Sequence, residues 1–128
     1  QGKLNIFDIA QKRSVWSYDA SSFFSPVITR GMIIVAESNS NLQSFSSKNL
    51  EESWSSEDYI NRDISNPVSF KGNLIFGDLE GYLHVLDPLN GITIGRKKIS
   101  KKPIKTIFSR SNSLYAIDEA FNLFSIKI

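Results

Sequence analysis

His84 is the only histidine in this chain of 128 residues, which contains no cysteine. A zinc site needs several His, Cys or carboxylate ligands, so a single imidazole does not predict one. A Ser-His-Asp triad would need a nucleophile on a sharp strand-to-helix turn, and the sequence shows no such turn. His84 lies between Leu83 and Val85 in an alternating pattern, so we expect a hydrogen-bonded histidine on the opposite face of a strand. The sequence predicts no catalytic and no metal-ligating residue.

Acidic residues gather in the segment from residue 51 to residue 63. They are Glu51, Glu52, Glu57, Asp58 and Asp63. A calcium loop needs closely spaced oxygen ligands around a glycine turn, and this segment contains no glycine. We therefore expect a solvated acidic edge in place of a cation site.

Cationic residues cluster between residues 96 and 105, although the net charge of the whole chain is only +2. The six residues are Arg96, Lys97, Lys98, Lys101, Lys102 and Lys105. Lysines protect an exposed sheet edge, and cationic surfaces also steer association with acidic proteins and anionic lipid headgroups. No aromatic residue is interleaved with them to stack on bases, which disfavours nucleic acid. A solvated edge and a partner-facing patch both remain open at this point.

The elements that position these residues follow from an internal repeat. Ser25-Pro26-Val27 recurs 41 residues later as Asn66-Pro67-Val68, and a weaker third copy follows 40 residues on, with Leu83 recurring as Leu123. Repeats of about 40 to 50 residues built from short strands are typical of propeller blades with four strands each. No segment keeps an apolar period of 3.6 residues, so we expect essentially no helix.

The predicted fold class is all-β, a partial β-propeller with about three four-stranded antiparallel blades of the quinoprotein-like type. Counting strands A to D outward from the axis, residues 1–20 supply strands C and D of one blade. Residues 21–61 and 62–100 form complete blades, and residues 101–128 supply strands A to C of the last. We expect the chain to be the C-terminal portion of a propeller whose N-terminal part completes that blade.

Several residues recur where a blade needs a turn or a contact with its neighbour. Glycine supplies positive φ or close approach of two backbones, tryptophan packs between blades, and aspartate caps a turn, as we also expect of Asp8. The third unit departs from this pattern, because Gly95 stands 41 residues after Trp54. The signature residues are Trp16, Gly31, Trp54, Gly72, Gly81, Asp87 and Gly91.

The segment from Gly77 to His84, which reads Gly-Asp-Leu-Glu-Gly-Tyr-Leu-His, is followed by Asn90-Gly91 and resembles the penultimate blade of the BamB family. These are propeller lipoproteins of the outer-membrane β-barrel assembly machinery. The likeness covers the whole chain in blade layout and is closest between Tyr59 and Ile99.

This resemblance implies a non-enzymatic scaffold without a cofactor, on the periplasmic face of the outer membrane of a Gram-negative bacterium. A lipidated N-terminal cysteine outside these residues would hold it there. The implied partners are the POTRA domains of BamA, other subunits of the machinery and unfolded outer-membrane proteins, without nucleic acid.

Two other functions remain open on the sequence. A pyrroloquinoline-quinone-dependent dehydrogenase shares the blade type, and it would need the quinone at the propeller axis, a bound cation and a catalytic Asp. The sequence shows no cation-ligand cluster and favours no single Asp. The other alternative is a generic protein-binding propeller in a different assembly.

Overall fold

The computed structural model describes residues 2–20 and 24–128 and contains thirteen strands within them. They form four antiparallel sheets, in the orders β1-β2, β3-β4-β5-β6, β7-β8-β9-β10 and β11-β12-β13. No helix in the described residues is long and apolar enough to cross a membrane. The strands are β1 (Gly2–Asp8), β2 (Arg13–Ala20), β3 (Val27–Thr29), β4 (Met32–Ala36), β5 (Leu42–Ser46), β6 (Glu52–Ser56), β7 (Val68–Phe70), β8 (Asn73–Gly77), β9 (Tyr82–Leu86), β10 (Thr93–Lys98), β11 (Ile104–Arg110), β12 (Ser113–Asp118) and β13 (Leu123–Ile126).

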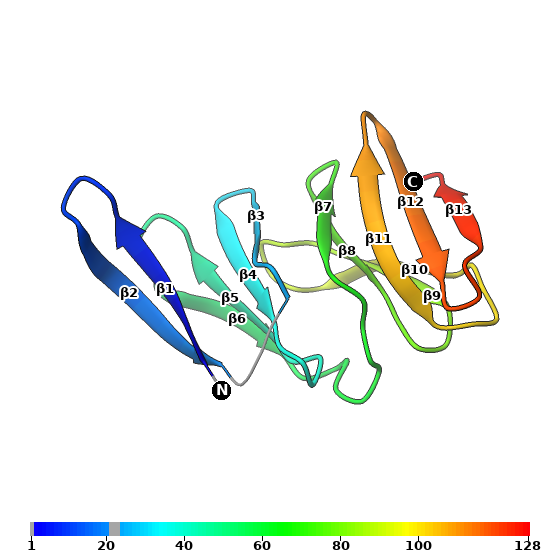
Figure 1. Ribbon diagram of the computed structural model, residues 1–128, viewed down its shortest axis with the longest axis horizontal. Coiled ribbons are helices and arrows are strands. Elements are labelled where there is room, and N and C mark those ends of the chain that lie inside the picture. The colour runs from blue at the N-terminus through cyan, green and yellow to red at the C-terminus, as the bar shows by residue number, and fades with distance from the viewer. Residues whose placement is uncertain (1, 21–23) are drawn as a thin grey trace.

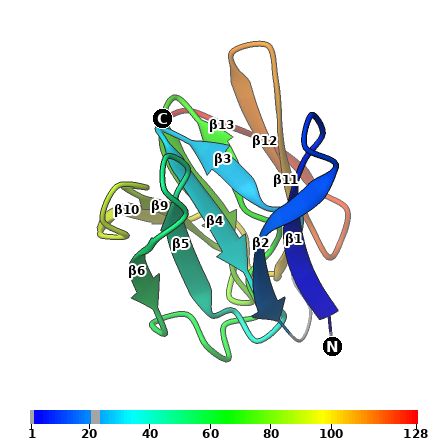
Figure 2. The same cartoon turned by 90° about the vertical axis from the view of Figure 1, so that its left-hand side faces the viewer.

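The four sheets lie side by side along the long axis of the molecule, in chain order, and each is twisted (Figure 1). Seen from the end, they lie one behind another like neighbouring blades (Figure 2). Within each sheet, strands consecutive in sequence are neighbours. The predicted fold class, an all-β partial propeller, is confirmed. The place of each sheet in a closed ring stays a prediction.

The two four-stranded sheets repeat each other in register. Phe45 pairs with Glu52 across β5 and β6, and 41 residues later Leu86 pairs with Thr93 across β9 and β10. Both pairs of strands carry a register shift directly after that point, so an extra residue on the outer strand bulges outward. Because of this shared bulge, Gly95 occupies the same structural position in its sheet as Trp54 does in the preceding one.

Two inner strands begin directly after a proline. β3 begins at Val27, after Pro26, and β7 begins at Val68, after Pro67. Pro26 and Pro67 lack the N–H that a ladder needs, so pairing starts at the next residue. Each of these inner strands has three residues and ends in a two-residue turn.

Positive φ at both turn positions closes these two hairpins. Arg30 and Gly31 have φ of 49° and 78°, and Lys71 and Gly72 have φ of 51° and 78°. Two successive positive φ angles define a type I′ turn, whose twist matches that of the strands it joins. Glycine at the second position avoids the steric cost that a side chain would carry there.

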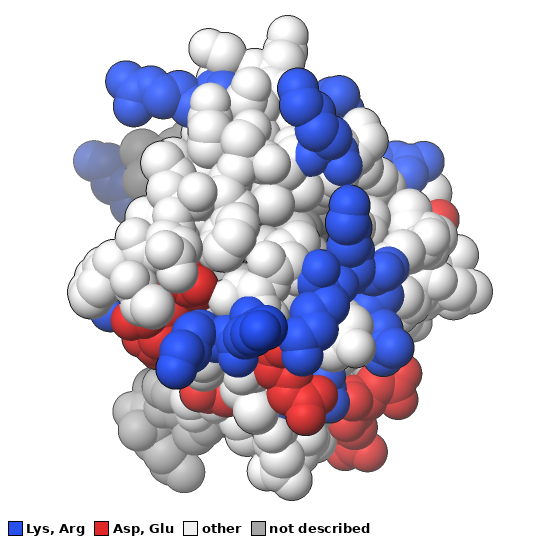
Figure 3. Space-filling view, turned by 90° about the vertical axis from the view of Figure 1, so that its right-hand side faces the viewer, with Lys and Arg blue, Asp and Glu red and all other residues white. Residues whose placement is uncertain are grey.

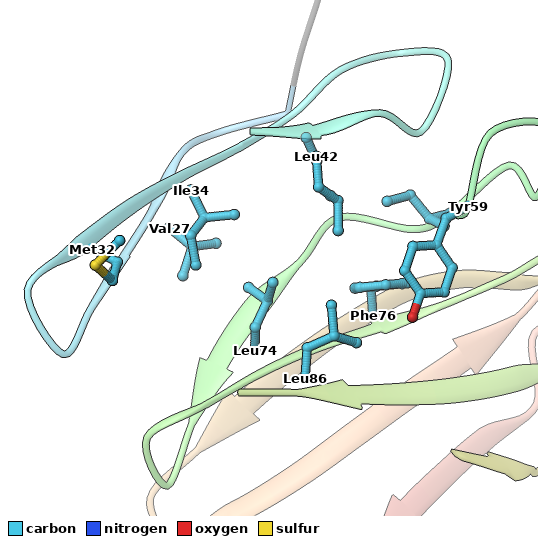
Figure 4. Close-up of a cluster of buried hydrophobic side chains, with 10 residues drawn as sticks. Val27, Met32, Ile34, Leu42, Tyr59, Leu74, Phe76 and Leu86 are labelled. Atoms are coloured by element: carbon cyan, nitrogen blue, oxygen red, sulfur yellow. The ribbon is translucent and has the colours of Figure 1, made fainter. Parts of the chain in front are cut away.

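Apolar side chains between neighbouring sheets form two cores. The first lies between the β3–β6 and β7–β10 sheets and includes Ile34, Leu42, Leu74, Phe76 and Leu86 (Figure 4). The second lies between the β7–β10 and β11–β13 sheets. Its buried members are Phe70, Ile75, Leu83, Ile104, Ile107, Leu114 and Ala116. Since β8 and β9 contribute alternate residues to both cores, the third sheet is buried on both faces.

Candidate interaction surface

The cationic residues lie on the outermost strand β10, on the loop that follows it, and on the inner strand β11. All six are exposed, and Lys and Arg side chains form a band over the face that carries β13 (Figure 3). Lys105 Nζ lies 3.9 Å from Glu119 Oε2 and 5.1 Å from the centroid of the Phe121 ring. The other five make no ion pair with any part of the chain that the structure describes. Their charge is therefore available to an external partner.

Strand alternation divides the cations of β10 between two faces. In the strand register Arg96 lies opposite His84 and Lys98 lies opposite Tyr82. Both side chains therefore lie on the face of the sheet that packs into the first core. Lys97 pairs with Leu83 and faces the β11–β13 sheet. Lys97 thus lies on the opposite face of β10 from Arg96 and Lys98.

Tyr82 supports the two cations that share its face. The Arg96 guanidinium carbon lies 4.6 Å from the centroid of the Tyr82 ring, and Lys98 Nζ lies 5.4 Å from it. The negative face of the ring offsets part of the repulsion between two like charges. Arg96 and Lys98 therefore present two adjacent positive charges in a defined position.

The loop that carries Lys101 and Lys102 is held by backbone contacts. Ile99 N and Ser100 N donate to Gly81 O, at 2.9 Å and 3.3 Å. A Cβ at Gly81 would lie 1.9 Å from Ser100 O, so only glycine allows this approach, and its φ of 87° also favours glycine.

Ser100 continues this attachment toward the last sheet. Its hydroxyl donates to Asp118 Oδ2 at 2.7 Å and accepts from Lys102 N at 2.9 Å. The loop is thereby tied to the turn before β9 on one side and to the end of β12 on the other. Such a loop pays less entropy on binding than a loop without these contacts.

Asp78, which follows β8, is a buried carboxylate that joins three segments. Its Oδ2 accepts from Arg62 Nη2 at 2.5 Å and lies 2.7 Å from His84 Nε2, while its Oδ1 accepts from Glu80 N and Tyr82 N. Its side chain is fully buried, and that of His84 is 4% exposed. Arg62 also pairs with Glu80 through Nη1 at 3.2 Å.

These contacts change the proton affinities of both buried groups. Burial lowers the pKa of His84 below its usual value, although hydrogen bonding to Asp78 opposes the shift. Burial alone would raise the pKa of Asp78, but the hydrogen bonds from His84, Arg62 and two backbone N–H groups outweigh it and lower that pKa. His84 is therefore a buried, hydrogen-bonded histidine, as its strand position predicted.

Trp54 joins the second sheet to the third. Its Nε1 donates to Pro88 O at 2.8 Å, and its indole covers Gly91, where a Cβ would lie 2.5 Å from the ring. In the same turn Asp87 Oδ1 accepts from Leu89 N at 2.9 Å and lies 3.7 Å from Arg30 Nη1. These contacts fix the turn before β10, and β10 with it.

Trp16 packs against the neighbouring sheet, and the acidic segment lies at the surface. Trp16 stacks on Tyr18 and meets Phe45 of the next sheet edge-on, with ring centroids 4.7 Å apart. All five acidic residues of the segment 51–63 are exposed. Among residues 2–20 and 24–128, no three His, Asp or Glu side chains converge as metal ligands would.

The sequence pattern did not reveal the burial of Asp78 within the segment from Gly77 to His84. The repeat does mark this position as an acidic one. Glu37 and Asp78 are 41 residues apart and Asp78 and Asp118 are 40 residues apart, which are the offsets of the repeat. Asp118 Oδ1 likewise accepts from Ala120 N and Asn122 N. Asp78 and Asp118 thus cap their turns by accepting backbone N–H groups, whereas Glu37 Oε1 accepts from the side-chain amide of Asn41.

Comparison with known proteins identifies the family. The family described as outer membrane protein assembly factor BamB matches residues 1–120. The protein of that name from Marinobacter adhaerens is 32% identical over 105 residues, which cover 82% of this chain and 27% of the relative. The one from Pseudomonas aeruginosa is 28% identical over 105 residues, covering 82% of this chain and 28% of the relative. The chain spans about a quarter of the length of these relatives.

Solved structures support the same fold. The crystal structure of BamB from Moraxella catarrhalis superposes with a TM-score of 0.85 at 24% identity, covering 95% of this chain and 36% of that chain. The computationally designed Ika4 protein superposes with a TM-score of 0.81 at 14% identity, covering 99% of this chain and 80% of that one. At these identities the superpositions show the fold alone. The sequence match over residues 1–120 and the relative from Marinobacter adhaerens show that the chain belongs to the family of the outer membrane protein assembly factor BamB.

Proposed function

We propose that this chain is part of a non-enzymatic scaffold in the machinery that assembles β-barrel proteins in the outer membrane. The observation that carries the proposal is the family match over residues 1–120, which includes every strand but β13. Relatives that match 82% of the chain are named as assembly factors. A rigid propeller that displays loops suits such a role, because loops on a fixed frame bind without reaction chemistry.

The proposed partners are the POTRA domains of BamA, together with other subunits of the machinery and unfolded outer-membrane proteins. The proposed location is the periplasmic face of the outer membrane, with a lipid anchor outside these residues. We assign the contact surface to the cations of β10 and the following loop. They are Arg96, Lys97, Lys98, Lys101 and Lys102, with Lys105 beside them.

The support for this surface is the clustering of five exposed cations between residues 96 and 102, none of which forms an ion pair within the described part of the chain. Lys105 beside them lies 3.9 Å from Glu119. Exposed cations without an ion partner attract an acidic protein and speed its association. Their desolvation free energy is small, because their charged groups stay near the rim of the contact.

Calorimetric titration of the full-length protein with soluble POTRA domains tests the proposal. A saturable, stoichiometric heat supports the scaffold function. Absence of binding by a folded protein rejects it, and an absorption spectrum of bound quinone in the same preparation would favour the dehydrogenase instead.

A further inference from the structure

Arg96 and Lys98 lie on the face of the third sheet that looks toward another four-stranded sheet. In the register they lie opposite His84 and Tyr82, on the side of the β3–β6 sheet, which has all four of its strands. The outermost strand expected from outside these residues would pair with β13, on the opposite side of β10. The exposure of Arg96 and Lys98 therefore does not come from the strand that the last sheet lacks.

Tyr82 brings these two cations together over a single ring. The Arg96 guanidinium carbon lies 4.6 Å from the ring centroid, and Lys98 Nζ lies 5.4 Å from it. Neither cation forms an ion pair within the described part of the chain. A cation–π contact does not require the N–H donors of either group, so these donors can bind an acceptor on a partner. Carboxylate oxygens form strong hydrogen bonds with such charged donors.

The charges next to Tyr82 leave room for one further negative charge. Arg62 bridges Asp78 Oδ2 and Glu80 Oε1, so these three groups together carry a single negative charge. The two exposed cations add two positive charges. The buried histidine beside them is neutral at pH 7, because burial lowers its pKa. The local balance is thus one positive charge, which a single carboxylate neutralises.

We propose that Arg96 and Lys98, positioned by Tyr82, bind one carboxylate side chain of an acidic partner protein. The inference rests on the proposed scaffold function and assigns its main charge contact to two of the five cations. Lys97, which lies between them in sequence, faces the other way and takes no part. Cations that already lie against a ring lose less conformational freedom on binding than cations on mobile side chains.

Calorimetric titration of the full-length protein with the peptide acetyl-Gly-Asp-Glu-Asp-Gly-amide at low ionic strength tests the site directly. Arg96→Gln and Lys98→Gln should each raise the Kd about fivefold. Lys97→Gln is the matched control, because it removes the same charge from the other face of the same strand. It should leave the Kd within twofold of wild type. Absence of saturable binding, or equal weakening by Lys97→Gln and Lys98→Gln, would overturn the inference.

Two substitutions of Tyr82 test the positioning of the cations. Tyr82→Phe keeps the ring and should bind the peptide within twofold of wild type. Tyr82→Leu keeps both cations but removes the ring, and should raise the Kd about threefold. Equal affinities of the two folded variants would overturn the role of the ring. Where Tyr82→Leu does not fold, the comparison of Arg96→Gln with Lys97→Gln decides.

Titration with soluble POTRA domains separates this inference from the proposed function. Binding that Arg96→Gln and Lys98→Gln weaken, and that Lys97→Gln leaves intact, supports both. Binding that all three variants retain equally keeps the scaffold function and overturns the site. Peptide binding without any POTRA binding rejects the scaffold function while supporting the carboxylate site.

An anionic lipid surface is the alternative occupant of the same cations. Vesicles of phosphatidylglycerol and phosphatidylcholine measure it with the same three variants. Vesicle binding that Arg96→Gln and Lys98→Gln abolish, together with unchanged peptide binding, would overturn the assignment to a protein carboxylate. Peptide binding that these two substitutions weaken, without vesicle binding, supports it.

Discussion

His84 Nε2 lies 2.7 Å from Asp78 Oδ2, and both side chains are buried between the second and third sheets. The rings of Tyr59 and Phe76 lie against the imidazole, with centroids 5.0 Å and 5.4 Å from it. His84 also pairs with Arg96 across β9 and β10, so the buried pair lies beside the outer strand. A buried polar contact is thus adjacent to the strand that carries three of the cations.

Asp78→Asn should destabilise the protein by about 2–4 kcal/mol. The substitution leaves the partly buried Arg62 without its buried anionic partner and turns an acceptor toward His84 into a group that also donates. Asp87→Asn is the control, because Asp87 accepts from a single backbone N–H and its side chain is 29% exposed. It should cost only about 0.5–1 kcal/mol. Urea denaturation of both variants measures the difference. Equal losses in the free energy of unfolding would show that the contacts of Asp78 contribute no more than those of Asp87.

Acid should weaken the fold in two separate steps. The pKa of His84 is lower in the folded protein than in the unfolded chain, so its stabilising effect is complete above about pH 6.5 and is lost as the pH falls below that value. Arg62 and Arg96 also disfavour the imidazolium. The pKa of Asp78 is lowered too, and its contribution is lost only below about pH 3.8.

His84→Gln separates these two steps. Glutamine keeps a donor for Asp78 but does not titrate, so the decline in the free energy of unfolding between about pH 6.5 and 5 should become smaller, while the decline below pH 4 remains. Urea titrations at pH 7.5, 5.5 and 3.5 measure both. A variant with the same pH profile as wild type would refute the assignment to His84.

Gly81→Ala should be among the most damaging single-methyl changes in this chain. The new Cβ would lie 1.9 Å from Ser100 O at a φ of 87°, so the loop after β10 has to move. Gly72→Ala is the matched control, with a φ of 78° and a nearest contact of 3.4 Å to the flexible Arg30 side chain. We expect about 1–2 kcal/mol from backbone strain in the control and at least about twice that for Gly81→Ala. Similar unfolding free energies would show that the close approach does not matter.

Trp54 should stabilise the folded protein through both its ring and its N–H. Trp54→Phe removes the donor to Pro88 O and should cost about 1 kcal/mol, because that carbonyl is left without this partner. Trp54→Ala also uncovers Gly91 and the apolar groups below the indole, and should cost about 3 kcal/mol. Thermal and urea unfolding of the two variants measure both losses. Equal unfolding free energies for Trp54→Phe and Trp54→Ala would contradict this prediction.

The repeat was sufficient to predict the sheets, because an offset of 41 residues fixes where strands and turns recur. Exposure of the cations followed from their position on an outer strand. Which face each cation of β10 takes did not follow, since it depends on the bulge between Thr93 and Gly95. The burial of Asp78 could not be predicted either. Its partner Arg62 is 16 residues earlier, in the connection between two sheets, and contacts it only in the folded protein. Local patterns predict turns, whereas such a cluster depends on tertiary packing.

The most direct test of the proposed contact surface is the rate at which the full-length protein associates with soluble POTRA domains of BamA. Stopped-flow measurements across a range of ionic strength would compare wild type with Lys98→Glu/Lys101→Glu/Lys102→Glu. The control, Lys12→Glu/Arg13→Glu/Lys48→Glu, reverses three exposed cations on other sheets. We predict that at low salt the first variant associates at least about tenfold more slowly and loses most of its salt dependence, while the control stays within twofold of wild type. Equal rates for all three proteins at low salt, or no association at all, would contradict the account.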